Sequence, residues 1–432
     1  MKHFRAILLL CAVLLLPASA RAGDSSAARL TLPEILAQAL ADNPELKADA
    51  ARWETFVQQA RQAGSLDDPM LMLRAQNLLV RDPLAFDRDT TSARVIGISQ
   101  AVPFFGKRDL KREAALQNAE EARWELEERK LELARMVKES WYRLLYIDRS
   151  LEIVEKNIAI LDDLTRFSET LYGVGQGLQQ DVLKAQVERS KMEEERISLR
   201  QKRRSLEASL NGLRFRPADL PIVPAAPLAL TPLAMDAKAL EDLAVRSRPL
   251  LKELAARERK GVARERLAKK EFYPDFTFSL EYMQRDPAMG EEGYDMYTAG
   301  VTFNLPVQRE RRHAMVAEAG SEIRMARAES DTARNRIRQG IADALAQMER
   351  SRRLAELYRE GIIPQADQAL ASATAAYRVG KVDFMNVLDS QMALFNFERD
   401  YVEAVAEHQR QLAVLEAVVG AELPTRKHGA GS

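Results

Sequence analysis

The clearest pattern in the sequence is a short alternation of apolar and polar residues near position 280. In "FTFSLEY" (276–282), aromatic or aliphatic side chains alternate with Thr, Ser and Glu, which is typical of a strand with one apolar and one polar face. "MYTAGVTFNLP" (296–306) follows after a polar loop containing Arg-Asp-Pro, so residues 274–306 are predicted to form a β-hairpin. "MLMLRAQNLLV" and "ARVIGISQAVP" flank another Arg-Asp-Pro loop and predict a second hairpin at 69–103.

A much longer helical pattern follows the first hairpin. Between Lys107 and Tyr172 there is no Gly or Pro, and at 1.5 Å per residue such a helix is about 100 Å long. Its apolar positions step alternately by three and four, which predicts a seam against another helix formed by Leu144, Ile147, Leu151, Val154, Ile158 and Leu161. On periodicity alone, an ordinary coiled coil explains this seam equally well. A helix opened by a capping box of Thr31 and Glu34 is predicted to precede the first hairpin, followed by a second helical stretch that ends near Ser65.

The sequence repeats itself with an offset of about 205 residues. "YGVGQGLQQDVLKAQ" (172–186) matches "YRVGKVDFMNVLDSQ" (377–391) at an offset of 205, and "GISQAVP" (97–103) matches "GVTFNLP" (300–306) at 203. Residues 30–213 and 236–420 are therefore predicted to be two copies of one unit, which runs helix, hairpin, long helix, turn, helix. The Pro-rich residues 214–235 are the expected linker, and 421–432 are expected to be a flexible tail.

Glycine and proline mark both ends of the long helices. Gly175 and Gly380 supply the backbone freedom that a helix C-terminus needs, so tip turns are predicted at 172–181 and 377–386. The hairpins are expected to pass into the long helices at Pro103, Gly106 and Pro306.

The second long helix is expected to be less regular than the first. Gly320, Gly340, Gly361 and Pro364 fall within it and predict interruptions. Because proline removes a backbone donor and clashes with the preceding turn, a kink is expected near Pro364.

Composition limits the class of protein. Residues 1–22 carry Lys2 and Arg5 before an apolar run and "PASARA" after it, so they are expected to be a secretory signal peptide. The single cysteine, Cys11, lies in this segment, so neither a disulfide nor a thiolate metal site is expected in the mature chain. The 64 basic and 64 acidic residues give no support to nucleic-acid binding. No stretch of the mature sequence predicts a membrane-spanning helix, which excludes an inner-membrane helical protein.

The sequence contains no recognisable catalytic, metal-binding or nucleotide-binding motif. The four histidines, His3, His313, His408 and His428, are scattered without metal-ligand spacing. The phosphate-binding, dinucleotide and nucleophile-elbow motifs are missing from the sequence. We therefore expect no enzyme activity, no metal site and no cofactor.

Four strands in one chain leave a sheet with two open edges. Lipid cannot hydrogen-bond the unpaired backbone groups of such edges, so other copies of the chain must complete a membrane sheet. Three copies supply twelve strands, which is an allowed size for a barrel with a lumen. The residues therefore predict a homotrimeric channel that is mainly α with a small β part, with its long helices gathered into a cylinder.

Several stretches resemble the TolC-type outer-membrane efflux proteins. These are "LTLPEILAQALADNPEL", the strand starts at Pro69 and Pro274, "SQAVPFFGKR" and "YRVGKVDFMNVLDSQ", and the resemblance covers roughly residues 30 to 420. It implies a trimer with a twelve-stranded barrel in outer-membrane lipid and a periplasmic α-helical barrel. It also implies docking on a periplasmic adaptor (membrane fusion protein) and on an inner-membrane pump of the resistance-nodulation-division type. The repeated turn is then the periplasmic tip of each helical hairpin, where the duct closes.

The same resemblance implies roles for four tip residues. Tyr377 matches a tyrosine that bonds an aspartate on the neighbouring hairpin, here Asp181, as a latch. Asn386 and Asp389 match the pore-gate positions. Val382 and Asn386 depart from the family pattern, which predicts a weaker latch and leaves Asp389 as the charged gate residue. Simpler alternatives remain for each position: Tyr377 packs the turn, Asp181 caps the returning helix, and Asp389 is a solvated charge.

Cargo and rival functions stay open at the level of sequence. "PFFGKR" resembles members paired with heavy-metal pumps, while multidrug efflux and type I protein secretion remain alternatives within the channel class. Outside that class, a structural periplasmic coiled-coil stalk accounts for the long helices but not for the paired hairpins.

Overall fold

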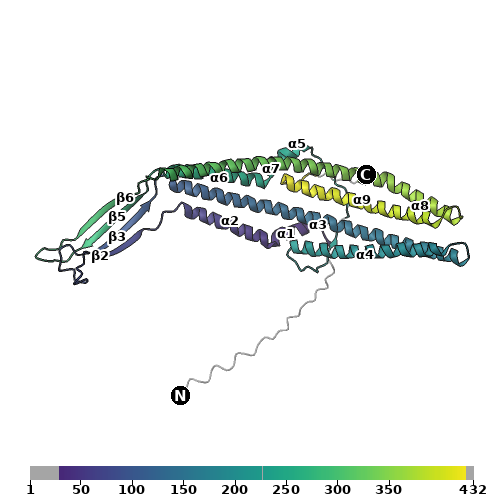
Figure 1. The fold of residues 1–432 in the computed structure, drawn as a ribbon, viewed down its shortest axis with the longest axis horizontal. Coiled ribbons are helices and arrows are strands. Elements are labelled where there is room, and N and C mark those ends of the chain that lie inside the picture. Colours follow the sequence, from purple (N-terminus) through teal and green to yellow (C-terminus); the bar gives the residue numbers. More distant parts are fainter. Residues whose placement is uncertain (1–28, 226, 425–432) are drawn as a thin grey trace, which may run out of the picture.

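The chain folds into an elongated molecule with a small sheet at one end and two helical tips at the other (Figure 1). A computed structural model describes residues 29–225 and 227–424. The expected signal peptide at 1–22 and residues 425–432 of the expected tail lie outside these described residues. Long helices run the whole distance between the sheet and the tips.

Four antiparallel strands form the sheet, in the order β2-β3-β5-β6. They are β2 (Met70–Gln76), β3 (Ala93–Val102), β5 (Phe276–Gln284) and β6 (Met296–Phe303). The two hairpins therefore lie side by side, with Gly97 of β3 opposite Glu281 of β5. One face is polar and carries the Arg74–Glu281 ion pair at 2.8 Å, while the other exposes a continuous set of apolar side chains, among them Leu71, Leu73, Ile96, Ile98, Phe278, Leu280, Val301 and Phe303.

Each half opens with two short helices that pack beside the long ones. In the first half these are α1 (Leu32–Asp42) and α2 (Pro44–Ala63), and in the second half α5 (Ala237–Ser247) and α6 (Pro249–Lys270). The backbone N–H of Thr31 donates to Glu34 at 2.7 Å, so the predicted capping box is present. A two-residue parallel pairing of β1 (Arg29–Leu30) with β4 (Val223–Pro224) holds the start of the linker against the first half.

The long helices form two hairpins. The first consists of α3 (Lys107–Gly173) and α4 (Gln179–Leu213), and the second of α7 (Arg309–Leu357), the π-helix η1 (Tyr358–Ile362), α8 (Ile363–Arg378) and α9 (Phe384–Val419). The α3 seam is buried at Leu144, Ile147, Val154, Ile158 and Leu161 and packs on both α4 and α9. Along this face Gln391 of α9 donates to Asn157 of α3 at 2.8 Å.

Two of the predicted interruptions in the second long helix are wrong. Gly320 and Gly340 lie inside the unbroken α7. A Cβ on Gly340 would meet the side chain of Val418 at 3.3 Å, so this glycine allows α9 to approach closely and does not break the helix. The irregularity expected near Pro364 is present as η1, whose wider turn places Pro364 at the start of α8.

The linker, residues 214–235, packs against both halves of the chain. Ile222 is fully buried in the cluster around α1 and α3. Farther along, Nε2 of His408 on α9 lies 3.0 Å from the Thr231 carbonyl oxygen, and Nδ1 lies 3.1 Å from that of Met348 on α7. Within the described residues, the helices are all too polar or too short to cross a membrane.

Candidate functional site

The two tip turns have the same backbone geometry. Gly175 and Gly380 both adopt positive φ, at 74° and 69°. Their N–H groups donate to the carbonyls of Tyr172 (3.0 Å) and Tyr377 (2.9 Å), and the N–H of the following residue reaches five positions back at 2.9 Å in both turns. This is the glycine-dependent way of ending a helix, which explains why both copies of the repeat keep glycine there.

The structure brings Tyr377 and Asp181 together at the tips of the two hairpins of one chain. The Tyr377 ring packs edge-on against Phe167 of α3, with centroids 5.9 Å apart. Burial and the nearby Asp181 carboxylate raise the pKa of Tyr377, and the Ser168 hydroxyl offsets part of the rise. The buried Tyr377 hydroxyl has no hydrogen-bond partner among the described residues, so the latch bond to Asp181 is not formed here.

Asp181 does not cap the returning helix. α4 begins at Gln179, Leu178 occupies the capping position, and no side chain bonds the free N–H groups of the first turn. Asp181 is only 8% exposed. Asp181 is therefore a buried carboxylate that does not cap its helix and lies near the half-buried Tyr377.

Asn386 and Asp389 lie on a different surface of the tip. Both are exposed, and their spacing of three places them on one face of the first turns of α9. The single chain therefore leaves these two positions open to whatever lies beyond the tip.

The strand-to-helix junctions form the opposite end of the helical part. Pro103 and Pro306 follow the last residues of β3 and β6, and Gly106 precedes α3 with φ at 84°. The neighbouring Lys107, for which the sequence predicted no role, is 1% exposed, and its Nζ lies 2.9 Å from Asp275 and 3.2 Å from Glu271. This buried ion cluster ties the start of α3 to the segment that links α6 and β5.

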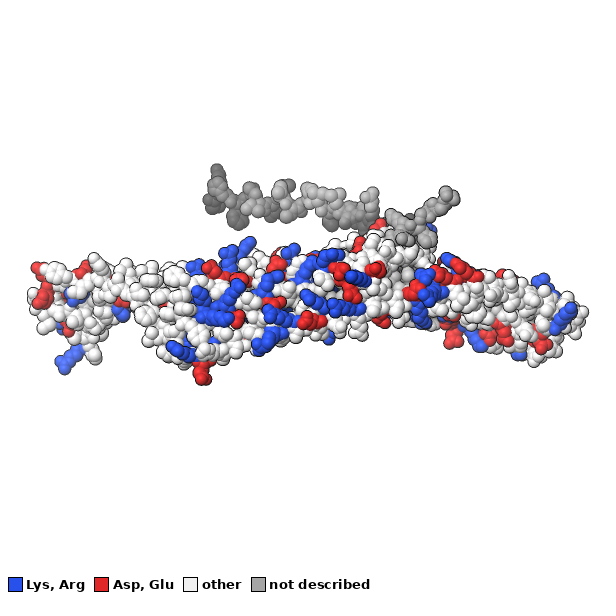
Figure 2. All heavy atoms as spheres, turned by 90° about the horizontal axis from the view of Figure 1, so that it is seen from above, with Lys and Arg blue, Asp and Glu red and all other residues white. Residues whose placement is uncertain are grey.

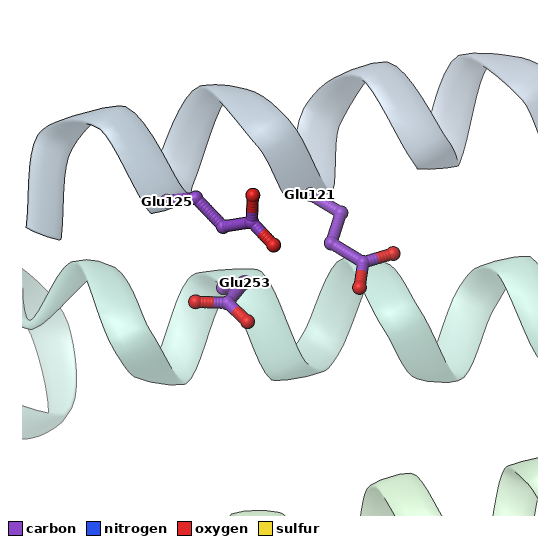
Figure 3. Close-up of side chains that lie close together, drawn as sticks. All are labelled: Glu121, Glu125 and Glu253. Carbon is purple, nitrogen blue, oxygen red and sulfur yellow. The ribbon is translucent and has the colours of Figure 1, made fainter. Parts of the chain in front are cut away.

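A carboxylate cluster between α3 and α6 was also not predicted (Figure 3). Carboxylate oxygens of Glu121, Glu125 and Glu253 lie within 4.8 Å of one another. Cations already neutralise them: Arg257 donates to Glu121 (2.7 Å) and Glu253 (2.9 Å), and Arg52 lies 3.3 Å from Glu125. With Lys260 also on Glu121, the arrangement is a cross-helix ion network and not an open set of metal ligands.

Comparison with known proteins identifies the family that has this architecture. The protein family described as "Outer membrane efflux protein" matches this chain at residues 35–214 and 240–421, which correspond to its two halves. The chain belongs to this family. It is therefore an outer-membrane channel with a large periplasmic helical part and serves as an exit duct for efflux. The predicted family and fold class are confirmed, and the stalk alternative is excluded.

Individual relatives match over nearly the whole chain. The cobalt-zinc-cadmium resistance protein CzcC of Cupriavidus metallidurans is 26% identical over 416 residues, covering 91% of each chain. The crystal structure of the outer membrane protein VceC of Vibrio cholerae has a TM-score of 0.76 at 19% identity, covering 90% of this chain and 96% of that one. CusC, with a TM-score of 0.75 at 15% identity, covers 90% and 92%. At these identities the two solved structures show a shared fold.

The ion network predicts a pH-dependent stability. Burial, opposed by Arg257 and reinforced by Glu125, Glu121 and Glu128, raises the pKa of Glu253 to about 7. Between pH 4.5 and 7 the folded chain keeps a proton that the unfolded chain has released, so stability falls as pH rises through this range. We expect Glu253→Gln to be about 1–2 kcal/mol more stable than the parent at pH 8 and to lose most of this advantage at pH 5.

Thermal unfolding of the purified protein in detergent at the two pH values measures this difference. Glu258→Gln, on the same helix and paired with Arg327, is the matched control and should show no pH-dependent gain. Equal behaviour of the two variants at both pH values would contradict the prediction.

Proposed function

We propose that three copies of the chain assemble into the channel and that the strands of all three close one barrel. The support is the sheet itself, whose outer strands β2 and β6 each pair on one side only. In lipid these open backbone edges require partners, which neighbouring copies supply by joining β2 of one copy to β6 of the next. Twelve strands then surround a lumen lined by the polar face of the sheet.

The helical part supports the same assembly through the internal repeat. α4 exposes Leu183 (53%), Val187 (54%) and Ile197 (67%). The residues 205 positions later on α9 are Leu388, Met392 and Val402, and they pack in the cluster against α3, with Leu388 only 3% and Val402 only 5% exposed. One copy of this apolar face is thus covered within the chain, and the other is not.

The repeat also identifies the surface that covers the exposed face. In the chain, α9 packs on α3, whose counterpart in the second half is α7 to α8. α8 has no buried residue among those described. A rotation that carries the first half onto the second would therefore seat α4 of one copy on α7 and α8 of the next, and repeating it closes a ring.

Disulfide trapping tests this register. Phe167 contacts Tyr377 within the chain, so the equivalent contact between copies joins Ser372 of one copy to Tyr172 of the next. We expect Ser372→Cys/Tyr172→Cys to run as a covalent trimer on a non-reducing gel after mild oxidation. The single cysteine of the parent, Cys11, lies in the expected signal peptide, so background cross-linking should be negligible.

The two single-cysteine variants are the controls and should form no covalent trimer. A double variant that remains monomeric, while the parent behaves as a trimer in detergent, would show that the proposed register is wrong.

The cargo that we propose is divalent heavy-metal ions, delivered by a periplasmic adaptor and an inner-membrane pump of the resistance-nodulation-division type. The end-to-end match to a cobalt-zinc-cadmium resistance protein carries this proposal. No metal-binding site in the duct is required, because a passive exit needs only a continuous lumen.

Growth of a strain lacking this protein tests the cargo. We expect reduced growth on graded cobalt, zinc or cadmium, restored by a plasmid copy, and parental growth on dyes and bile salts. Sensitivity to dyes and bile salts alone would replace metal efflux by multidrug efflux. If the strain grows normally in every condition and loses a secreted protein, the duct serves type I secretion.

The tip is the proposed gate of this duct. In a trimer the exposed Asn386 and Asp389 would ring the narrow end three times, and the Asp389 carboxylates would favour cations. Tyr377, half-buried near Asp181 where the two hairpins meet, would restrain their separation.

Single-channel recording in planar bilayers tests both roles. We expect Asp389→Ala to lose most of the cation preference at unchanged conductance, because the ring charge is removed without altering the turn. Tyr377→Phe should raise the conductance, because it removes the hydroxyl that would bond Asp181 when the latch forms. Tyr146→Phe, which removes a half-buried tyrosine hydroxyl from α3 away from the tip turns, is the control and should behave as the parent. Unchanged selectivity in Asp389→Ala, or unchanged conductance in Tyr377→Phe, would contradict the corresponding role.

A further inference from the structure

Positive charge is concentrated where the helices meet the sheet. Residues 107–112, 264–271 and 309–312 carry eleven basic and four acidic side chains, although the whole chain has 64 of each. These segments are the first turns of α3 and α7 and the end of α6, which all lie at the sheet end of the helical part. On the face seen in Figure 2, Lys and Arg side chains begin where the helices begin and continue along the helical part, where Asp and Glu side chains lie among them.

Seven cations in these segments have no anionic partner within the described chain, and two of them, Arg108 and Arg312, donate instead to backbone carbonyls. Elsewhere the helices pair many of their cations, such as Arg257 with three carboxylates. By contrast, no carboxylate among the described residues lies within 4.0 Å of Lys111, Arg112, Lys270, Arg309 or Arg311, a set that we call the collar. All five are exposed or half-exposed, so their charges remain available to an external anion.

Exposed apolar side chains lie between the collar and the sheet. Phe105 is 78% exposed, Leu305 70% and Val307 77%, and none of them is covered in the single chain. Tyr273, half-exposed, stacks on Phe104 with ring centroids 4.6 Å apart, and the Lys270 ammonium lies over both rings. From the sheet outward the surface therefore passes from apolar strands through aromatic and aliphatic side chains to unpaired cations.

This order is the one that a membrane boundary requires. Apolar side chains belong in the acyl region, aromatic rings at the level of the headgroups, and lysine and arginine beside the phosphates. Because the helical part of an outer-membrane channel of this family lies in the periplasm, the collar meets the periplasmic leaflet, which consists of phospholipids.

We propose that the collar binds the phosphate groups of anionic phospholipids in the periplasmic leaflet. This rests on the placement of the sheet in the outer membrane. Nucleic acid is not a competing occupant, because the collar lies at the helix ends next to the exposed apolar residues Phe105, Leu305 and Val307 and the apolar face of the sheet. Bound lipid would fix the depth of the sheet in the membrane and supply the counter-charge that the chain itself lacks at this level.

The test uses the purified full chain in detergent, titrated with phosphatidylglycerol or with phosphatidylcholine of the same acyl chains, and follows the thermal unfolding midpoint. We expect phosphatidylglycerol to raise the midpoint at lower concentration than phosphatidylcholine. Arg309→Gln/Arg311→Gln should raise the half-saturating phosphatidylglycerol concentration by about tenfold, since each cation beside an anionic lipid adds to the attraction.

Matched variants distinguish lipid binding by the collar residues from a general effect of removing positive charge. Arg334→Gln/Arg336→Gln removes two exposed arginines from the same helix, also without a carboxylate within 4.0 Å among the described residues, and should leave the titration unchanged. Arg309→Lys/Arg311→Lys keeps the charge and should titrate close to the parent. Equal responses to the two lipids, or a glutamine variant that titrates as the parent does, would overturn the proposal. Inorganic phosphate that reproduces the full shift would show a simple anion site in place of a lipid site.

A failure of the trimer proposal can be distinguished from a failure of the lipid-binding proposal. The lipid titration needs neither conduction nor covalent trimers, so it reports on the collar even if the disulfide-trapping experiment fails. Conversely, normal trimer trapping together with no preference for phosphatidylglycerol counts against the collar alone.

Discussion

The structure depends on one constraint: a membrane sheet cannot keep open edges. Within its described residues a single chain contributes the sheet β2-β3-β5-β6, in which the outer edges of β2 and β6 have no partner strand. Every other large feature is compatible with repairing this deficit through copies of the same chain. The two hairpins lie side by side because the chain is duplicated, and the uncovered faces of α4 and α8 lie on the flanks where neighbours would join. Oligomerisation is thus a condition for the membrane part to exist and not an addition to a finished fold.

Most of the fold could be predicted because its signals are local and occur twice. The period-two alternation at 276–282, the absence of Gly and Pro from 107 to 172, and the paired glycines of the tips each specify one element, and the offset of 205 shows that each element recurs. The prediction was wrong for Gly320 and Gly340, because glycine was taken as a breaker on intrinsic propensity of about 1 kcal/mol per residue. In a helix of 49 residues packed along α6 and α9, tertiary contacts outweigh that term, and at Gly340 the missing side chain is what lets Val418 approach.

The residues of the candidate site were less predictable from the sequence than the fold was. The proximity of Tyr377 to Asp181 came only from family resemblance, because no local pattern reports that two residues 196 positions apart lie close together. Lys107 and Glu253 were missed for the opposite reason. Each looks like an ordinary solvated charge in a highly charged helix, and only the packing of α3 against α6 and against the start of β5 reveals that it is buried.

The repeat is broken at charged positions of the tip, and this bears on how a gate there would work. Asn386 is the counterpart of Asp181, and Asp389 is the counterpart of Lys184. In the chain these counterparts are not equivalent, because Asp181 is buried beside Tyr377 while Asn386 is exposed. A ring built from six near-equivalent hairpins would place three lysines among three aspartates and largely cancel their field at close range. Since Lys184 is half-buried and Asp389 exposed, the two charges need not reach the lumen equally. Cation preference at the tip therefore requires that the two hairpins of each chain present different surfaces to the lumen, so the closed end should follow the threefold symmetry of the chains and not the near-sixfold symmetry of the helices.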